Sequence, residues 1–490
     1  MAAWHASQVR GARSGRCALL IFFGLMLACV VSISGCGSST TTTSGTPATT
    51  PAESSTTANG GGASTTGSGG GSSTTTSGSD LFGLGMSQLP GGVPVFGTSL
   101  FAAPVPVGTV AGQKHLPALW SVTSGPKWSM EQIDAAERWP LAVFELNSQS
   151  ILGDRVLVVG QDARDAQAQT PEDSFAAVRI NGAPWAVTEM DSRVPPGTSV
   201  ELTALGATGD PTDFNSFFIA VGGALKGAPP AQYLSDDITG ARPISTISVN
   251  GADWNPAVDL PLPAGVSSAE ATAVTYCGPG TAAPGVVAAG VGQVSDPTLG
   301  TRTVAIVWHS TDNGTTWKVI SDASMSEAGR NMDAQFMAAD KTHIVVVGEI
   351  DVAAASAAGG ATQRESFIWT LAADGSWSLK DNQTSLTTGM SSTMTALAAR
   401  QDGGFLLASQ FYETAAGPTL PGGDLTHKQT VALSSSPDGA TWTDATTFVP
   451  DLDKSAIING IADADGYDVL MGMDTSGAGA SWTVESASIK

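Results

Sequence analysis

A short turn signal closed by tryptophan recurs along this chain and limits what the chain can fold into. The clearest copy runs from Ser310 to Trp317 (Ser-Thr-Asp-Asn-Gly-Thr-Thr-Trp), and the next from Ser436 to Trp442 (Ser-Pro-Asp-Gly-Ala-Thr-Trp). Shorter echoes end at Trp377, Trp254, Trp185 and Trp128. The closing tryptophans are 57 to 69 residues apart, which suits one antiparallel sheet of four strands with its loops. Repetition at this interval predicts a repeat architecture.

The residue types in the clearest turn have separate physical roles. Residues 303–308 before it are apolar and largely β-branched, which is typical of a strand. Asp312 can accept hydrogen bonds from backbone N–H groups, and Gly314 can adopt a backbone conformation that other residues resist. Trp317 then begins the return strand and buries a large ring between sheets. We therefore expect a framework role for Ser310, Asp312, Gly314 and Trp317, and for Ser436, Asp438, Gly439 and Trp442.

These turns resemble the Asp box, or BNR repeat, of β-propellers in the sialidase-like superfamily. The resemblance is specific at residues 310–317, moderate at 436–442 and weak elsewhere. It implies that each box is the turn between the third and fourth strands of a blade and that its role is structural. It also implies an all-β fold, a β-propeller of four-stranded antiparallel blades.

Strand patterns over residues 80–490 agree with such blades. In the fourth repeat, residues 271–276, 285–292, 303–309 and 317–321 are short, apolar and separated by turn residues. Six recurrent units and one composite unit predict seven blades, with six or eight left open. The last unit ends without a fourth strand, so we expect residues 81–109 to complete it. Pairing of the first strand with the last would close the ring and hide two sheet edges.

The first 35 residues have the features of a signal peptide. Arg10, Arg13 and Arg16 form a basic region, and an almost unbroken apolar run follows. The run closes with Ile-Ser-Gly-Cys, which resembles the bacterial lipobox and implies cleavage before Cys36 and lipidation of its thiol, with palmitate among the acyl groups. An uncleaved signal anchor is the alternative. Either interpretation predicts a protein held at a cell membrane on the extracytoplasmic side.

Residues 36–79 are expected to be a disordered tether. After Cys36 they are almost entirely Ser, Thr, Gly and Ala, with Glu53 as the only charged residue. Such a segment cannot bury enough apolar surface to offset the entropy of ordering. Flexible-linker scaling gives it a reach of roughly 35–40 Å. We expect it to lift the domain clear of the membrane surface.

Charge and cysteine usage limit the partners and the chemistry. The chain has 22 basic and 44 acidic residues, a net charge of −22. This balance argues against nucleic acid and anionic lipid as partners, because both require a basic surface. Of the four cysteines, only Cys277 would remain free in the mature chain, so no internal disulfide is expected. We interpret Cys277 as a small core residue.

The connections between second and third strands are long in the middle repeats and should share one face. They span about residues 160–174, 222–245, 293–302, 351–365 and 412–429. Long loops on one face of a rigid scaffold are where such proteins usually bind ligands. The candidate binding face contains Tyr233, Asp236, Asp237, Arg242, Arg302, Arg364, Tyr412 and His427. Solvated insertions without a role are the alternative.

The resemblance raises the possibility of sialidase activity. That reaction needs an arginine cluster, a Tyr nucleophile with its Glu, and an acidic proton donor. Arg179, Arg242, Arg302 and Arg364 come from successive repeats and could converge. The family's Phe/Tyr-Arg-Ile-Pro sequence is absent, however, and the chain has only four tyrosines. A glycoside hydrolase acting on envelope or host glycans is therefore the alternative interpretation.

No other pattern indicates catalysis, a metal or a cofactor. The five histidines are isolated and lack metal-binding spacing. The run from Asp463 to Asp468 has clustered carboxylates but lacks the later bidentate acid of a calcium loop, so a hairpin turn is expected. We expect a monomeric, non-catalytic binding or scaffolding module for protein or glycan, without cofactor or metal. Photosystem assembly-factor propellers also use such boxes, but no basic patch supports that interpretation.

Overall fold

The structure is a computed structural model, and the part of the chain that it describes lies almost entirely in the expected repeats. The described residues are 29–30, 99–107, 114–122, 129–133, 138–147, 154–162, 174–190, 198–209, 216–226, 238–297, 299–353, 362–381, 390–400, 402–413, 429–449, 452, 456–464, 467–473 and 479–489. All belong to a unit formed by Met1–Gly35 and Leu81–Lys490. The second unit, Cys36–Asp80, contains the predicted tether and lies outside the described residues.

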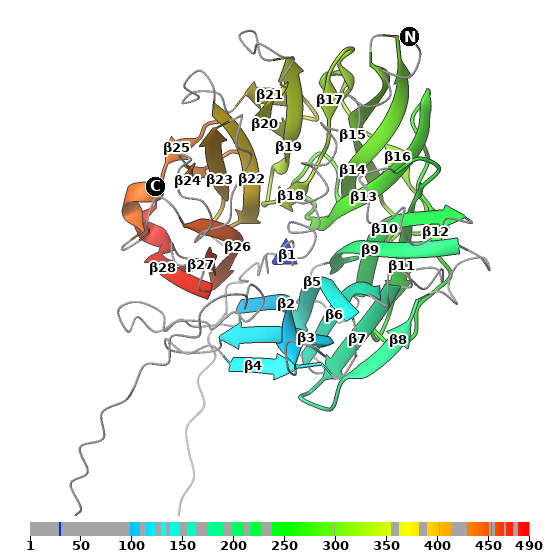
Figure 1. Cartoon of the computed structure of the whole chain (residues 1–490), viewed down its shortest axis with the longest axis vertical. Coiled ribbons are helices and arrows are strands. Elements are labelled where there is room, and N and C mark those ends of the chain that lie inside the picture. Colours follow the sequence, from blue (N-terminus) through cyan, green and yellow to red (C-terminus); the bar gives the residue numbers. More distant parts are fainter. Residues whose placement is uncertain are drawn as a thin grey trace, which may run out of the picture. The chain divides into compact units, whose positions relative to one another are not determined.

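The described part is all-β and contains seven hydrogen-bonded sheets (Figure 1). The first three sheets hold β2 (Ser99–Val107), β3 (Lys114–Val122) and β4 (Ser129–Gln132); β5 (Arg138–Asn147), β6 (Asp154–Asp162), β7 (Ser174–Ile180) and β8 (Ala186–Glu189); and β9 (Thr198–Ala207), β10 (Phe218–Lys226), β11 (Arg242–Ser248) and β12 (Val258–Asp259). The fourth holds β13 (Val266–Cys277), β14 (Gly285–Asp296), β15 (Gly300–Ser310) and β16 (Lys318–Val319).

The remaining three sheets continue the pattern. They hold β17 (Asn331–Met332), β18 (Phe336–Ala339), β19 (Ile344–Ala353), β20 (Thr362–Leu371) and β21 (Trp377–Asp381); β22 (Met390–Ala399), β23 (Phe405–Glu413), β24 (Gln429–Ser436) and β25 (Thr443–Asp444); and β26 (Ile457–Ala464), β27 (Tyr467–Met473) and β28 (Gly479–Glu485). Three short 3-10 helices are described: η4 (Ala323–Ser326), η6 (Thr446–Phe448) and η7 (Ser486–Ser488). No helix among the described residues is long and apolar enough to span a membrane.

The sheets are arranged as a β-propeller. Strands of one sheet pair antiparallel with their sequence neighbours, and adjacent sheets meet along β5, β9, β13, β18, β22 and β26. Figure 1 shows these strands nearest the centre and the short strands β12, β16 and β25 on the outside. The expected four-stranded antiparallel blades are therefore confirmed. Their strands are mostly longer than the sequence pattern indicated, because the hairpins continue beyond the core.

The number of blades depends on how the two terminal sheets are counted. Five sheets have four or more strands, whereas β2–β4 and β26–β28 form sheets of three strands each. Taken as one split unit, these terminal sheets give a propeller of six blades. The sequence analysis predicted seven blades and left six open.

The first strand of the propeller does not lie where the sequence analysis placed it. Residues 81–109 were expected to complete the last sheet, but β2 pairs along its whole length with β3, from Ser99 opposite Val122 to Val107 opposite Lys114. The last sheet has the order β26-β27-β28. Residues 81–98, 108 and 109 lie outside the described residues, so closure of the ring by this segment stays a prediction. From the predicted leader, only β1 (Cys29–Val30) is described, and it pairs in parallel with Ala142 and Val143 of β5.

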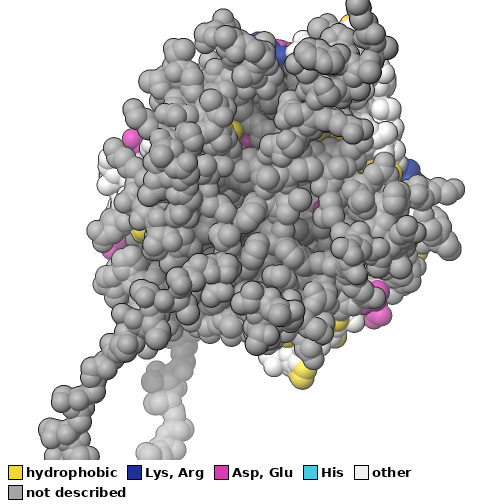
Figure 2. Space-filling view, viewed as in Figure 1, with side chains coloured by type: hydrophobic (Ala, Val, Ile, Leu, Met, Phe, Trp, Pro, Cys, Tyr) yellow, Lys and Arg dark blue, Asp and Glu magenta, His cyan; other side chains and the backbone are white. Residues whose placement is uncertain are grey.

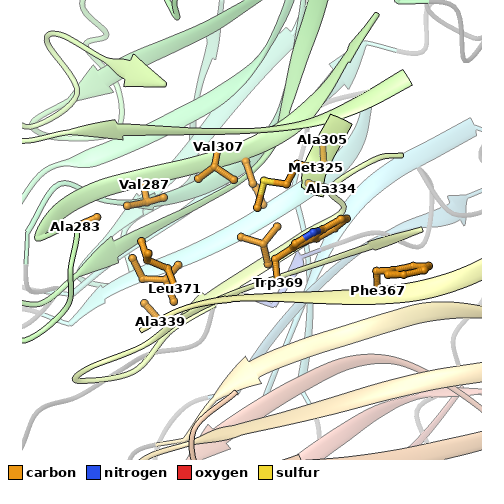
Figure 3. Packing of buried hydrophobic residues seen from close by; sticks show 14 of the residues in the cluster. Ala283, Val287, Ala305, Val307, Met325, Ala334, Ala339, Phe367, Trp369 and Leu371 are labelled. Atoms are coloured by element: carbon orange, nitrogen blue, oxygen red, sulfur yellow. The ribbon is translucent and has the colours of Figure 1, made fainter. Parts of the chain in front are cut away.

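Apolar side chains from neighbouring sheets fill the spaces between blades. Figure 3 shows one such layer, where Val287 and Val307 of one sheet face Trp369 and Leu371 of the next. Cys277 is fully buried in the same cluster, as expected for a core residue, and burial raises the pKa of its thiol. The core is thus divided into layers between sheets, and every blade depends on its neighbours.

Four of the described tryptophans that close a turn, Trp254, Trp317, Trp377 and Trp442, pack against the preceding sheet. Trp254 belongs to the cluster around Leu157 and Val159, and Trp442 packs on the cluster around Val345. The Nε1 atom of Trp317 donates to Ser245 Oγ of the preceding sheet at 3.0 Å. These equivalent positions agree with the expected repeat. Trp128 lies outside the described residues.

A second repeated device occurs where β9 and β13 meet their neighbours. Each carries a bulge at a threonine, Thr203 in β9 and Thr272 in β13. Thr203 Oγ1 donates to the Ala271 carbonyl of the next sheet, and Thr272 Oγ1 donates to the Ala334 carbonyl, both at 2.6 Å. The bulges therefore supply hydrogen bonds that join successive inner strands.

Candidate functional site

The predicted binding-face residues do not form a loop cluster in the described part of the chain. Tyr233, Asp236, Asp237 and His427 lie outside the described residues. The other four are strand residues: Arg242 begins β11, Arg302 lies in β15, Arg364 in β20 and Tyr412 in β23. In the fourth repeat the expected long loop is a tight connection, because β14 extends to Asp296 and β15 begins at Gly300. The sequence analysis placed the strand ends too early.

Arg302 has a structural role, contrary to its expected place on the binding face. Its side chain is 9% exposed, and its Nε atom lies 3.0 Å from Asp296 Oδ2. Its Nη2 atom donates to the Ser326 carbonyl at 3.2 Å. The Asp296 carboxylate also accepts from the backbone N–H groups of Leu299 and Gly329. Arg302 therefore fixes the end of its own hairpin against η4.

Two of the other arginines that the sequence analysis named are also engaged within their own sheets. Arg242 Nη1 lies 2.6 Å from Asp259 Oδ2 in an ion pair that is about half exposed. The guanidinium of Arg179 lies over the ring of Trp185, 5.4 Å from its centroid. The backbone of Arg364 is in register with Asp351, and its side chain lies outside the described part. The three arginine side chains that the structure describes therefore do not converge on one site.

Tyr412 was expected on the binding face but is only 4% exposed. It lies opposite Ser391 in the ladder of β22 and β23 and opposite Gln429 in the ladder of β23 and β24. A ring buried between two paired strands contributes to packing. Tyr412 is therefore a core residue.

Acidic side chains occupy equivalent positions at three consecutive inner strands. We call Glu201, Glu270 and Asp333 the acidic arc. The equivalence follows from a glycine that faces each acid from the neighbouring strand. An added Cβ at Gly222 would lie 1.7 Å from the Glu201 carbonyl oxygen, and one at Gly290 would lie 2.0 Å from that of Glu270. At Gly348 the distance to the Asp333 carbonyl oxygen would be 1.8 Å. Each acid therefore lies just before or at the point where its strand becomes irregular, which is the bulge in β9 and β13 and the break between β17 and β18. The three side chains are partly exposed.

The acidic arc continues into the next interface through Glu349. This residue is 5% exposed, and its carboxylate accepts a hydrogen bond from Thr393 Oγ1. The backbone N–H of Glu349 donates to Asp333 Oδ1 at 2.8 Å. Asp333 and Glu349 of one sheet are thus linked to each other, and Glu349 is linked to Thr393 of the next sheet.

Burial changes the charge state of the middle member of the arc. Desolvation raises the pKa of Glu270 to about 7, because a low-polarity surrounding disfavours the carboxylate. The stem of Glu270 packs where Gly223 of the preceding sheet leaves room, with Cγ 3.2 Å from the position of an added Cβ. Near neutral pH, Glu270 can therefore donate or accept a proton.

We expect Glu270→Gln to make the protein more resistant to unfolding at pH 8. The folded-state pKa lies above the usual value, so folding takes up a proton between about pH 4.5 and about pH 7. Stability linked to Glu270 is therefore lost as the pH rises through this window. Denaturant unfolding between pH 4 and pH 8 should show a flatter pH dependence in the variant. Glu327→Gln, at an exposed ion pair with Arg330, is the control and should keep the wild-type slope.

A signal for two of the three arc positions, Glu201 and Glu270, exists in the sequence but was missed; the segment after Asp333 lacks it. Residues 201–205 read Glu-Leu-Thr-Ala-Leu, residues 270–274 Glu-Ala-Thr-Ala-Val, and residues 393–397 Thr-Met-Thr-Ala-Leu. The Thr-Ala pair marks the bulge, and the residue two positions before the threonine is the arc position. This second repeat is weaker than the tryptophan turns because it has no rare residue.

The expected framework residues form hydrogen-bonded turns. Gly314 and Gly439 have positive φ values of 82° and 72°, as the turn requires. Asp312 Oδ1 accepts from Thr316 N at 2.8 Å, and Trp317 Nε1 donates to the Gly314 carbonyl at 3.1 Å. Burial alone would raise the pKa of Asp312, but hydrogen bonds from Thr316 and Ser310 outweigh it and hold the pKa below its usual value.

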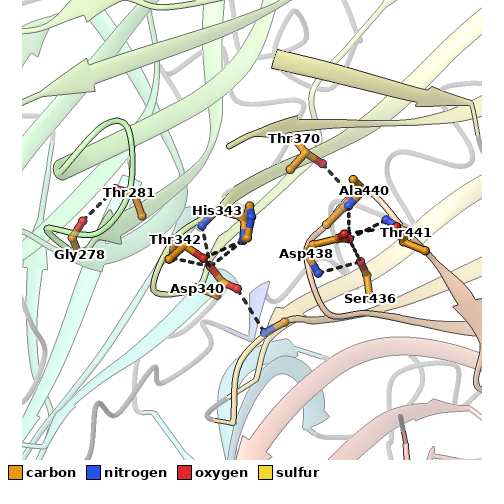
Figure 4. A network of polar contacts seen from close by, with 12 residues as sticks. Gly278, Thr281, Asp340, Thr342, His343, Thr370, Ser436, Asp438, Ala440 and Thr441 are labelled. Carbon is orange, nitrogen blue, oxygen red and sulfur yellow. Dashed lines mark hydrogen bonds and ion pairs between the residues drawn. The ribbon is translucent and has the colours of Figure 1, made fainter. Parts of the chain in front are cut away.

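The turn at residues 436–442 has the same organisation (Figure 4). Asp438 Oδ1 accepts from Ala440 N at 2.9 Å and from Thr441 N at 2.7 Å. The Gly439 carbonyl accepts from Thr370 Oγ1 of the preceding sheet at 2.8 Å. The turn is therefore tied to two sheets.

A third such turn, at residues 248–254, was recognised in the sequence only by its Asn-Gly and Trp. In the structure Ser248 Oγ accepts from Gly251 N at 2.8 Å, as Ser310 Oγ does from Gly314 N. Asn250 Oδ1 takes the place of the aspartate and accepts from Asp253 N at 2.7 Å. Ser248 two residues before Asn250 was the signal that could have identified it.

The described residues contain no group of three or more His, Cys, Asp or Glu side chains suited to a metal ion. On the face drawn in Figure 2, the coloured Asp and Glu side chains lie in several separate places. The expectations of no metal and no cofactor remain predictions.

Comparison with known proteins found similar solved structures but no family. No family model and no curated protein matches the chain. Solved structures with a similar fold include a protein of unknown function from Dyadobacter fermentans DSM 18053 (TM-score 0.42, 12% identity, 71% of this chain and 95% of that chain covered). The Trypanosoma rangeli sialidase (TM-score 0.40, 11% identity) matches over 79% of this chain and 60% of its own length. The GH93 α-L-arabinofuranosidase of Fusarium graminearum (TM-score 0.41, 10% identity) matches over 81% of this chain and 92% of its own.

Proposed function

We propose that the protein is a membrane-tethered extracytoplasmic propeller that binds or scaffolds protein or glycan without catalysis. The observation that carries this proposal is the use of its arginines. Arg302 is held by Asp296, Arg242 by Asp259, and Arg179 stacks on Trp185, each within its own sheet. A sialidase would need several guanidinium groups directed at one substrate carboxylate. Arginines engaged in this way support a framework with a binding role.

The charge of the molecule favours neutral or cationic partners. The chain has a net charge of −22, and the acidic arc places three of its acidic residues at the inner strands. Such a surface attracts ammonium or guanidinium groups and repels polyanions. We propose that the partner meets the face formed by the connections between second and third strands, and that the turns at 310–317 and 436–442 are structural Asp boxes.

We propose that Cys36 carries the lipid anchor and that residues 37–79 are the tether. The basic, apolar and small-residue pattern before Cys36 supports this. Metabolic labelling with radioactive palmitate in a bacterial host should mark the full chain, and Cys36→Ser should lose the label and leave the membrane fraction. Cys277→Ser, at the buried thiol, is the control and should keep the label. Equal labelling of the Cys36 variant would contradict the proposed anchor.

Glu270 gives a specific reason to keep the glycoside hydrolase alternative. A carboxylic acid with a pKa of about 7 suits general acid catalysis. The deciding experiment applies the detergent-solubilised full chain to a glycan array, to envelope proteins and to a fluorogenic glycoside panel. We expect binding without turnover. Turnover that Glu270→Gln abolishes, while binding persists, would establish the hydrolase instead.

A further inference from the structure

Four Asn-Gly sequences occur in the described part of the chain, and the structure places the three that lie in turns in different chemical situations. The three in turns are Asn181-Gly182, Asn250-Gly251 and Asn313-Gly314, and the fourth, Asn459-Gly460, lies within β26. Asparagine followed by glycine is the sequence in which the backbone nitrogen of the next residue most easily attacks the side-chain amide, because glycine offers no steric hindrance. The local sequence therefore gives all three the same intrinsic reactivity. Differences between them must come from the fold.

Asn181 and Gly182 form an exposed hairpin turn. They connect β7 to β8, both have positive φ values (50° and 69°), and both side-chain positions are exposed. In this turn Ala183 N donates a backbone hydrogen bond to the Ile180 carbonyl at 2.9 Å, and this bond does not involve Gly182. An added Cβ at Gly182 would meet no atom within 4 Å. Both the attacking nitrogen and the amide are thus at the surface.

At the two other turns, a serine hydroxyl accepts a hydrogen bond from the glycine N–H. Gly251 N donates to Ser248 Oγ at 2.8 Å, and Gly314 N donates to Ser310 Oγ at the same distance. Both glycines are buried. The side-chain amide of Asn250 is also held in place, because its Nδ2 atom donates to Asp253 Oδ2 at 2.8 Å. The attacking nitrogen must lose a buried hydrogen bond before either ring can form.

We propose that Asn181 is a site of spontaneous deamidation in the folded protein, and that Ser248 and Ser310 protect the Asn-Gly sequences of the two other turns, at Asn250 and Asn313. In this reaction Gly182 N bonds to Asn181 Cγ, the Cγ–Nδ2 bond breaks, and ammonia leaves with the proton of the Gly182 N–H. Water then opens the succinimide at either carbonyl and gives aspartate or isoaspartate. The net change is loss of ammonia and gain of water, with no oxidant or reductant.

The test is peptide mapping by mass spectrometry of the full chain aged at pH 8 and 37 °C. We expect Asn181 to convert roughly tenfold faster than Asn250 and Asn313, because local opening is required at the latter two. In denaturant the three rates should become similar, since all share the same dipeptide. Similar rates in the folded protein, or slower conversion at Asn181, would overturn the proposal.

A second variant tests protection directly. Ser310→Ala frees Gly314 N and should accelerate deamidation at Asn313 by roughly tenfold. Asn250 is the internal control, because its own serine remains in place and its rate should not change. Circular dichroism confirms that the variant is folded. Acceleration at both sites would show general loosening, and no acceleration at Asn313 would show that the hydroxyl gives no protection; either result would reject the role of Ser310.

Discussion

Replacing Gly290 with alanine is expected to destabilise the propeller by about 3 kcal/mol, since a methyl group must be forced against backbone atoms. The added Cβ would lie 2.0 Å from the Glu270 carbonyl oxygen and 2.8 Å from Ala271 Cα. The backbone carbonyl at the bulge cannot rotate away without breaking the ladder between β13 and β14. Because Thr272 of the same bulge hydrogen-bonds to Ala334, the strain should extend to the next sheet. Denaturant unfolding should show a lower midpoint.

Gly278→Ala is the matched control for this prediction. Gly278 lies just after the same strand, β13, and an added Cβ would meet no atom within 4 Å. The free energy of unfolding of Gly278→Ala should stay within about 0.5 kcal/mol of the wild-type value, as for most surface substitutions. If Gly290→Ala were as stable as Gly278→Ala, the close approach of β14 to the bulge would not exist in solution.

Arg400→Met is expected to cost about 3–5 kcal/mol, because it removes one partner from a buried ion pair. Arg400 is 7% exposed and its Nε atom lies 3.5 Å from Asp468 Oδ2, whose side chain is fully buried. The guanidinium also donates to the carbonyl oxygens of Ser486 and Ile489, the latter at 3.1 Å. Arg400 follows β22, whereas its partners belong to the last sheet and η7. The variant should therefore release the C-terminal sheet first.

Limited proteolysis followed by mass spectrometry should detect that release. Cleavage is expected after residue 450 in the variant at protease concentrations that leave the wild type intact. Arg330→Met is the control, since its pair with Glu327 is more than 40% exposed on both sides and should contribute between about 0 and 1 kcal/mol. Equal protection of the last sheet in wild type and Arg400→Met would show that Arg400 does not hold the C-terminal sheet in place.

The repeated tryptophan made the fold class predictable from sequence. Each turn of this kind needs a large ring, a glycine and a carboxylate or amide at fixed spacing. These residues are close together in the chain, so the pattern can be recognised in the sequence. Trp254, Trp317 and Trp442 indeed pack against the preceding sheet. The strand boundaries were less predictable, because hairpins such as β14–β15 continue past the core, where apolar patterning no longer marks them.

The candidate site was predicted poorly for the same reason. Arg302 and Tyr412 look like loop residues in sequence, and only their burial in paired strands shows that they are structural. Glu201, Glu270 and Asp333 are ordinary acids in three separate strands, and nothing local brings them together.

By itself, the sequence determined the all-β class, the repeated turn and its glycine conformations, because these depend on residues a few positions apart. The tertiary structure decided where β2 pairs, which arginines are engaged, and that three acids share one level at the inner strands. Those outcomes depend on contacts between sheets some sixty residues apart, where backbone pairing and desolvation act across the fold and leave no local pattern.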